Sequence, residues 1–201
     1  MSKQVSVFAP VSIGNVSVGF DSLGLALKPI NGDLLGDVVT VQTLNNNNAS
    51  NQPFEMCGTY ADRLPTDKES NIVWHVVRTF ENHLLSLNIS IEPVKVTLHK
   101  NIPVCSGLGS SACSVVAAYY AMNHYYNEPF DETTLLKMMG EAEAEISGSL
   151  HYDNVAPCFL GGLQLMLNNP SNSASSKVAQ TIPVFDQVYW VLAYPDVLIS
   201  T

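Results

Sequence analysis

The alternation of apolar and polar residues predicts β-strands along much of the chain. Three segments alternate clearly and are rich in Val, Phe or Thr, which favour extended backbone. These strands are expected at Gln4–Ala9, Asp37–Leu44 and Val94–His99. Shorter strands are expected at Phe54–Thr59, Gly162–Leu167, Gln180–Val184 and Gln187–Tyr194, and at the end of the Gly- and Ser-rich stretch Val11–Leu27. Because Asn45–Pro53 is turn-rich and has no apolar face, it predicts the solvated end of a hairpin.

Apolar residues at helical spacing predict three substantial helices and a short one. They are expected at Asn71–Leu87, at Ser110–Tyr126, from Asp131 to about Ile146, and at Asn154–Leu160. Ser70 or Asn71 is the expected N-cap of the first, and Asp131 that of the third. The second is small and apolar nearly all round, so we expect it to be buried. No repeat or linker divides the chain, which indicates one α+β unit.

The amino-acid composition disfavours some classes of function. The 201 residues include 46% apolar and only 13% charged side chains, with a net charge of -9. Low charge at normal hydrophobicity is typical of a folded protein. An excess of acids disfavours binding to nucleic acid or to an anionic membrane, because either needs clustered Lys or Arg. The chain shows no secretory signal and no apolar run of membrane-spanning length, so we expect a soluble, cytoplasmic protein.

The four cysteines are dispersed and form no CxxC pair. The sequence therefore lacks the main motif that would indicate a zinc-ribbon or thioredoxin-like site. Reduced thiols are the simpler interpretation for a chain of this length.

A glycine-rich segment, Pro103–Ser114 (PVCSGLGSSACS), follows a predicted strand and opens a predicted helix. Glycines let backbone N–H groups turn inward, and the helix N-terminus adds free donors and a partial positive charge. Together they predict an anion cradle suited to polyphosphate. A tight connection without a ligand is the alternative. The segment also matches the weak dinucleotide pattern G-x-G-x-x-A, but no following strand supports that reading, and a Walker A loop is excluded.

Three further polar groups are candidates. Glu143 points away from Glu141 and Glu145 on the third predicted helix. These glutamates could bind a cation, and the alternative is that they form an acidic face exposed to solvent. His151 to Asn154 (HYDN) could be a metal site or a loop that hydrogen-bonds to itself. Asn15 and Asp21 flank a glycine turn, and each alone would be an ordinary turn residue.

Taken in order, these motifs resemble a known family. Ala9–Ala26, Pro103–Ser114 and Ser147–Pro157 with Gly161 and Gly162 are similar to the first motif, the phosphate loop and the substrate loop of homoserine kinases. These enzymes belong to the superfamily of galactokinase, mevalonate kinase and phosphomevalonate kinase. The resemblance implies ATP-dependent phosphorylation of the L-homoserine hydroxyl, a step of threonine biosynthesis. It also implies a mixed, largely antiparallel sheet with helices, of the ribosomal protein S5 domain 2-like type.

The resemblance further implies roles for single residues. Ser111, or its neighbour Ser110, would hold Mg²⁺ together with Glu143, and Asn154 would act in catalysis with Glu143. Asn154 would orient the acceptor hydroxyl without a dedicated base, because a neutral amide cannot take a proton. Asn15, Asp21, His151 and Asn154 would bind homoserine. The ATP-binding residues would be Asn71, Lys100, Pro103, Val104, Cys105, Ser106, Gly107, Leu108, Gly109, Ser110, Ser111, Ala112 and Cys113.

The family's third, glycine-rich motif and its carboxylate-binding arginines find no counterpart among these residues. We therefore expect residues 1–201 to be the N-terminal, ATP-binding domain with the start of a linkage to a missing C-terminal domain, inactive alone. An exposed apolar patch, and with it a homodimer, is a further expectation. Another kinase of the superfamily and a non-catalytic nucleotide-binding module are the alternative functions.

Overall fold

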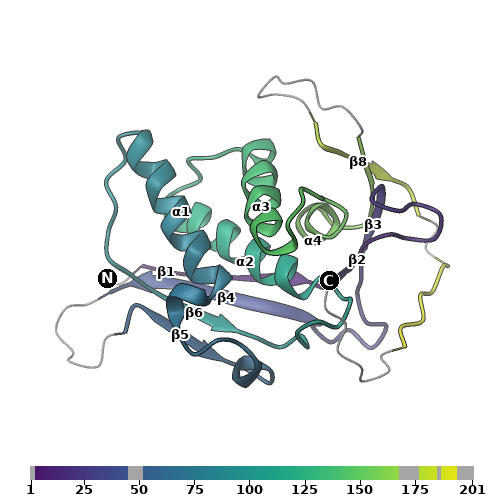
Figure 1. The fold of residues 1–201 in the computed structure, drawn as a ribbon, viewed down its shortest axis with the longest axis horizontal. Coiled ribbons are helices and arrows are strands. Elements are labelled where there is room, and N and C mark those ends of the chain that lie inside the picture. Colours follow the sequence, from purple (N-terminus) through teal and green to yellow (C-terminus); the bar gives the residue numbers. More distant parts are fainter. Residues whose placement is uncertain (1–2, 45–51, 168–176, 185–186, 194–201) are drawn as a thin grey trace.

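The computed structural model describes residues 3–44, 52–167, 177–184 and 187–193. Two four-stranded sheets organise them (Figure 1). The first has the order β1 (Gln4–Pro10), β4 (Gly36–Thr43), β6 (Val94–His99) and β5 (Phe54–Cys57). The second has the order β2 (Ser12–Ile13), β3 (Leu23–Ala26), β7 (Leu163–Met166) and β8 (Ala179–Ile182). All neighbours are antiparallel except β5 and β6, so the predicted α+β fold with a mixed, largely antiparallel sheet is confirmed.

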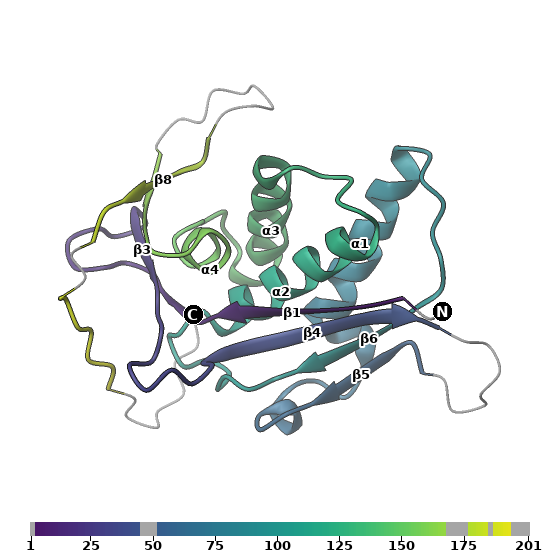
Figure 2. The same ribbon diagram turned by 180° about the vertical axis from the view of Figure 1, so that it is seen from behind.

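The helices all lie to one side of the first sheet, as the front and back views agree (Figures 1 and 2). They are α1 (Ile72–Ser86), α2 (Ser110–Tyr125), α3 (Glu132–Ser147) and α4 (Val155–Leu160). Two short 3₁₀ turns, η1 (Ala61–Arg63) and η2 (Lys68–Ser70), connect β5 to α1. α2 packs on β1 and β4, and α4 packs against β3 of the second sheet. The segments that resemble a phosphate loop and a substrate loop thus lead into neighbouring helices, α2 and α4.

Two helix starts follow the predicted capping chemistry. The Asn71 side chain accepts a hydrogen bond of 2.9 Å from the backbone N–H of Val73. Asp131 accepts one of 2.8 Å from the N–H of Thr134. Such caps satisfy N–H groups that the helix itself leaves free, and each stabilises its helix by about 1 kcal/mol.

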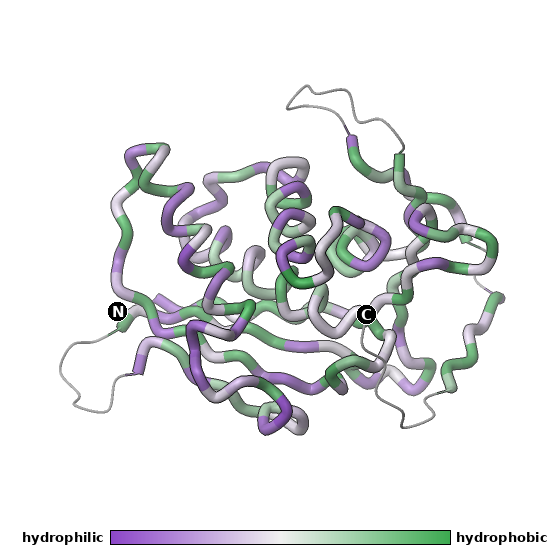
Figure 3. Tube along the Cα trace, in the orientation of Figure 1, coloured by the Kyte–Doolittle hydropathy of each residue, from purple (hydrophilic) through white to green (hydrophobic). Residues whose placement is uncertain are grey.

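The core lies between the first sheet and its helices. Val39 and Val41 of β4 face inward, and Val38 and Thr40 face the other side, as the period of a strand requires. Hydrophobic and hydrophilic residues also alternate along α1, whose buried residues include Val76 and Phe80 (Figure 3). α2 is buried nearly all round, which confirms the sequence prediction. Full burial of each large apolar side chain contributes roughly 1.5–3 kcal/mol.

The predicted hairpin between β4 and β5 is wrong. β4 pairs with β1 and β6, and β5 lies on the far side of β6, parallel to it. Parallel neighbours require a long crossover, and α1 supplies it between β5 and β6. The turn-rich segment Asn45–Pro53 resembles a hairpin tip in composition, but most of it lies outside the described residues.

The predicted strand at Gln187–Tyr194 does not form over residues 187–193. Tyr189 and Val191 are 75% and 94% exposed there, so their apolar pattern meets no sheet partner. Tyr194, the last residue of that predicted strand, lies outside the described residues. Other large apolar side chains are also exposed, including Val18, Phe20, Ile30 and Leu34. In the described part of the chain, no helix is long and apolar enough to cross a membrane.

Candidate active site

The predicted phosphate loop, residues 103–109 of the segment Pro103–Ser114, joins β6 to the N-terminus of α2. Its last residue, Gly109, has a positive φ of 59° and precedes the helix without capping it through a side chain. The first-turn N–H groups of α2 are therefore open to an anion, which the helix dipole also attracts. A Cβ at Gly109 would lie 2.3 Å from the Ser12 hydroxyl and 2.9 Å from Oδ1 of Asn154. Glycine is needed here because two other segments approach the loop closely.

A cavity of about 390 Å³ opens beside this loop, within the range typical of small-molecule sites. Its wall combines the loop, the start of α1, part of α3 and the start of α4. Of the predicted ATP-binding residues, it is lined by Asn71, Lys100, Val104, Cys105, Ser106, Gly107, Gly109, Ser110 and Ser111. Pro103, Leu108, Ala112 and Cys113 are not in the lining, and the last two are fully buried in α2.

The two predicted metal residues lie next to each other across α2 and α3. The Ser111 hydroxyl donates a hydrogen bond of 2.5 Å to Oε1 of Glu143. Oε2 of Glu143 is buried and has no hydrogen-bond partner, and the same holds for the hydroxyls of Ser106 and Ser110. Buried polar atoms are normally paired. Three unpaired oxygen atoms around one loop therefore indicate a place for a ligand.

Burial raises the pKa of Glu143, while the hydrogen bond from Ser111 and the charge of Lys100 act in the opposite direction. A bound cation would stabilise the ionised carboxylate in the same way. The described residues bring together no group of three or more His, Cys, Asp or Glu that could hold a metal alone. Mg²⁺ characteristically uses one or two protein oxygens and takes the rest from phosphate and water. Glu143 and Ser111 fit that kind of site.

The predicted acceptor residues form a chain of contacts between two loops. Oδ1 of Asn15 accepts a hydrogen bond of 2.8 Å from the N–H of Asp21. Oδ1 of Asp21 lies 3.7 Å from Nδ1 of His151, an ion pair when the histidine is protonated. The N–H of Asn15 donates a 3.2 Å hydrogen bond to Oδ2 of Asp153, two residues after His151. We call Asn15, Asp21, His151 and Asp153 the acceptor ring.

Asn154 connects the acceptor ring to the phosphate loop. Its Oδ1 accepts a 3.3 Å hydrogen bond from the hydroxyl of Ser12, and the N–H of Ser12 donates to the carbonyl of Leu108 at 3.3 Å. Of the four predicted acceptor residues, Asn154 lines the 390 Å³ cavity. Asn15, Asp21 and His151 contact one another or Asp153, the residue before Asn154.

Asp153 was considered only as part of a possible metal site within His151–Asn154, and not as a residue of the acceptor site. It is 4% exposed, and burial raises its pKa, as does the nearby charge of Asp21. A Cβ at Gly14 would lie 2.2 Å from Oδ2 of Asp153, and one at Gly24 only 1.7 Å from its backbone carbonyl. Two glycines of the first motif thus make room for this residue. The available sequence signal was the position of Asp153 between the predicted acceptor residues His151 and Asn154.

Lys100 and Asn71 were predicted to bind ATP. Both line the cavity, but their polar ends already have protein partners. The Asn71 side chain caps α1, and its amide donates to the Met56 sulfur at 3.0 Å. The Lys100 ammonium lies 2.6 Å from Oδ2 of Asp37, a residue that the sequence analysis left without a role. Only the remaining surface of each side chain is presented to the cavity.

Comparisons with known proteins agree with this geometry. Residues 71–162 match the family described as "GHMP kinases N terminal domain". The homoserine kinase of Cytophaga hutchinsonii is 34% identical, with a TM-score of 0.69 over 90% of this chain and 52% of that one. A putative homoserine kinase of Listeria monocytogenes is 20% identical, with a TM-score of 0.56 over 94% of this chain and 62% of that one. The mevalonate diphosphate decarboxylase of Enterococcus faecalis, described for its ATP binding, is 16% identical, with a TM-score of 0.57 over 91% and 52%.

The likenesses at 20% and 16% identity show the fold alone. The sequence match over residues 71–162 and the fold of the described residues are both those of the GHMP kinase N-terminal domain, and a homoserine kinase is among the structural neighbours. The present chain spans about half the length of that homoserine kinase, 52% of the chain.

Proposed function

We propose that this chain supplies the ATP site and the acceptor site of a kinase that phosphorylates the side-chain hydroxyl of L-homoserine. The observation that carries the proposal is the acceptor ring at the edge of the phosphate loop, joined to it through Asn154 and Ser12. A kinase needs a polyphosphate cradle and a polar acceptor pocket within reach of each other, because phosphoryl transfer depends mainly on positioning and charge stabilisation. The 34% identity to a homoserine kinase supports the choice of acceptor.

In the nucleotide half, residues 103–109 and the free N–H groups of α2 would bind the triphosphate. Apolar side chains of Leu64, Pro65 and Leu98 line the same cavity and would contact the base, beside Asn71 and the stem of Lys100. Mg²⁺ would be held by Glu143 and Ser111. When bound, the cation would neutralise charge on the phosphate oxygens.

In the acceptor half, Asn154 would orient the hydroxyl toward the phosphate loop. Its neutral amide cannot accept the proton, so a phosphate oxygen or water would take it as the new O–P bond forms. The bond between the γ-phosphorus and the β,γ-bridging oxygen of ATP would break in the same step, and ADP would leave. Asp21 is 42% exposed at the side chain and would pair with the substrate ammonium. His151 would border the same group, and Asn15 would hold the turn that presents Asp21.

The test is an acceptor panel with the natural-length protein. ADP release is measured with L-homoserine, L-serine, L-threonine, mevalonate and galactose, each with ATP and Mg²⁺. Release that depends most strongly on homoserine is expected. A preference for mevalonate would assign another kinase activity of the superfamily, and binding of AMPPCP without ADP release on any acceptor would leave a nucleotide-binding module.

A further inference from the structure

An ion pair is buried directly under the phosphate loop. Asp37, at the start of β4, is 0% exposed, and Lys100, just after β6, is 2% exposed. The ammonium Nζ of Lys100 lies 2.6 Å from Oδ2 of Asp37. Desolvating two charges is costly, and apolar residues of similar size are often equally or more stabilising at such positions. Stability alone therefore does not explain why an ion pair is buried at this position.

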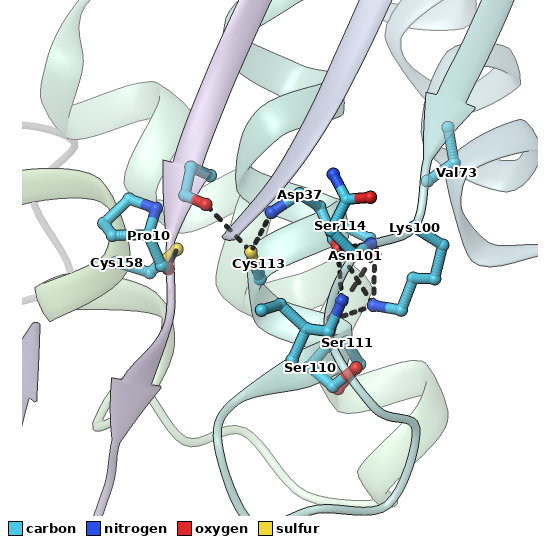
Figure 4. Close-up of polar contacts among 12 residues, drawn as sticks. Pro10, Asp37, Val73, Lys100, Asn101, Ser110, Ser111, Cys113, Ser114 and Cys158 are labelled. Carbon is cyan, nitrogen blue, oxygen red and sulfur yellow. Dashed lines mark hydrogen bonds and ion pairs between the residues drawn. The ribbon is translucent and has the colours of Figure 1, made fainter. Parts of the chain in front are cut away.

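All three ammonium protons of Lys100 have acceptors. Besides Asp37, Nζ donates to the backbone carbonyl of Ser110 at 2.8 Å and to the hydroxyl of Ser114 at 3.0 Å. The Ser114 hydroxyl lies 2.6 Å from the same Asp37 oxygen. Figure 4 shows these contacts converging on the first turn of α2. The ammonium thus faces the helix, and has no proton left for a nucleotide.

The second oxygen of Asp37 holds the other end of the loop. Oδ1 accepts hydrogen bonds from the backbone N–H groups of Asn101 at 2.8 Å and Ile102 at 3.2 Å. Residues 103–109 of the phosphate loop are therefore fixed at their start through Asp37 and at their end through Lys100. Both anchors belong to one buried ion pair.

We propose that Asp37 and Lys100 are positioning residues that clamp both ends of the phosphate loop, so that the loop is preorganised for the β- and γ-phosphates of ATP. This role rests on the proposed nucleotide site. Neither residue touches the phosphates through its charge. They act by fixing the α2 first turn, whose free N–H groups and Ser110 and Ser111 hydroxyls would otherwise shift with the loop. Preorganised donors bind more tightly because less order is lost on binding.

The deciding measurement compares affinities for two probes, AMPPCP with Mg²⁺ and adenosine, by calorimetry on this chain. Lys100→Met alone leaves the Asp37 carboxylate buried without its partner and could unfold the chain. The double variant Asp37→Asn/Lys100→Met removes both charges, keeps an acceptor for Asn101 and Ile102, and leaves the net charge unchanged. Its matched control is Glu55→Gln/Lys95→Met, which removes the ion pair of 2.8 Å between β5 and β6 on the face away from the helices.

A thermal melt first shows that both double variants are folded. In the Asp37/Lys100 variant, affinity for AMPPCP should fall about tenfold, or ~1.4 kcal/mol, while affinity for adenosine stays within twofold of the parent, about 0.4 kcal/mol. The control should match the parent with both probes. Unchanged AMPPCP affinity in the folded Asp37/Lys100 variant, or an equal loss for adenosine, would overturn the positioning role alone. No binding of AMPPCP by the parent chain would overturn this role and the proposed nucleotide site together.

Discussion

The hydroxyl of Ser111 donates to Oε1 of Glu143 across 2.5 Å and so joins the first turn of α2 to the last turns of α3. The other carboxylate oxygen of Glu143 is buried without a partner, beside the phosphate-loop cavity. Glu141 and Glu145 of the same helix are exposed, and Glu145 pairs with His75 at 2.7 Å. Of Glu141, Glu143 and Glu145, only Glu143 is thus turned toward the site.

This difference predicts unequal effects of charge removal. Glu143→Gln should raise the Mg²⁺ concentration needed for half-maximal AMPPCP binding by about tenfold or more, because it removes the negative charge that faces the loop. Glu141→Gln and Glu145→Gln are the matched controls and should leave the Mg²⁺ requirement unchanged. Calorimetric titrations at a series of Mg²⁺ concentrations measure it. Equal, mild effects of all three substitutions would identify the run of glutamates as a solvated acidic face.

Gly109 provides a second contrast within the same loop. Gly109→Ala adds a Cβ that would lie 2.3 Å from the Ser12 hydroxyl and 2.9 Å from Asn154. Gly32→Ala also places alanine at positive φ, but its Cβ would meet no atom within 4 Å. Both changes carry the backbone cost of roughly 1–2 kcal/mol for a left-handed alanine.

Only the change at Gly109 should therefore disturb the junction of the two sites. AMPPCP affinity is expected to fall about tenfold or more in Gly109→Ala, a loss of at least ~1.4 kcal/mol, and to stay unchanged in Gly32→Ala. Thermal melts of both variants separate this loss from the shared backbone strain. If the two alanines weaken AMPPCP binding equally, the close approach of Ser12 and Asn154 has no part in the site.

Much of this arrangement follows from the sequence. The alternation in β1, β4 and β6 and the helical periods of α1, α2 and α3 are long enough to identify each element, and Asn71 and Asp131 identify two helix starts. The parallel placement of β5 could not be read locally, because pairing depends on the crossover through α1 rather than on the residues of the strand.

The buried ion pair was within reach of the sequence but was not found. Val94, Val96 and Leu98 face inward along β6, and Lys100 continues that phase. Asp37 likewise shares the inward phase of β4 with its buried valines. The register aligns Val38 with His99, which puts the acid and the base opposite each other one step further on. An acid and a base at inward positions of two strands indicate a buried pair, but only once the strands are known to be neighbours.

The buried carboxylate of Asp153 predicts a pH dependence of stability. Its pKa is raised in the folded state, so the folded chain holds this proton more tightly than the unfolded chain does. The contribution of Asp153 to the free energy of unfolding is then most favourable below the ordinary aspartate pKa. It declines as the pH rises through the window between that value and the raised folded one.

Asp153→Asn removes this titration and keeps an oxygen that can accept the Asn15 N–H. The free energy of unfolding of the variant, relative to the parent, should therefore increase from acidic to neutral pH. Urea titrations across that range measure the difference. Asp62→Asn, whose parent side chain is 77% exposed, serves as the control and should follow the parent at every pH. A parent-to-variant difference that is flat with pH would show that burial does not penalise the Asp153 charge.

The last prediction concerns turnover by residues 1–201 themselves. Homoserine carries a carboxylate, and a buried carboxylate requires a cation or several donors. The sequence has two arginines, and the structure places both away from the acceptor ring. Arg63 is 73% exposed beside Asp62, and Arg78 pairs with Glu81 on α1 at 2.6 Å. The Lys100 ammonium is fully engaged with Asp37, Ser110 and Ser114.

We therefore expect the chain to fold and to bind AMPPCP, but to phosphorylate homoserine poorly. An absent partner for a buried charge costs roughly 3–5 kcal/mol, and each 1.36 kcal/mol is about tenfold in rate. Homoserine-dependent ADP release should thus be at least ~10²-fold slower than that of the Cytophaga hutchinsonii homoserine kinase assayed in parallel. AMPPCP binding confirms that the chain is folded in the same buffer. A rate close to that of the reference enzyme would refute the prediction, and would mean that the carboxylate is held by backbone donors of the acceptor ring rather than by a cation.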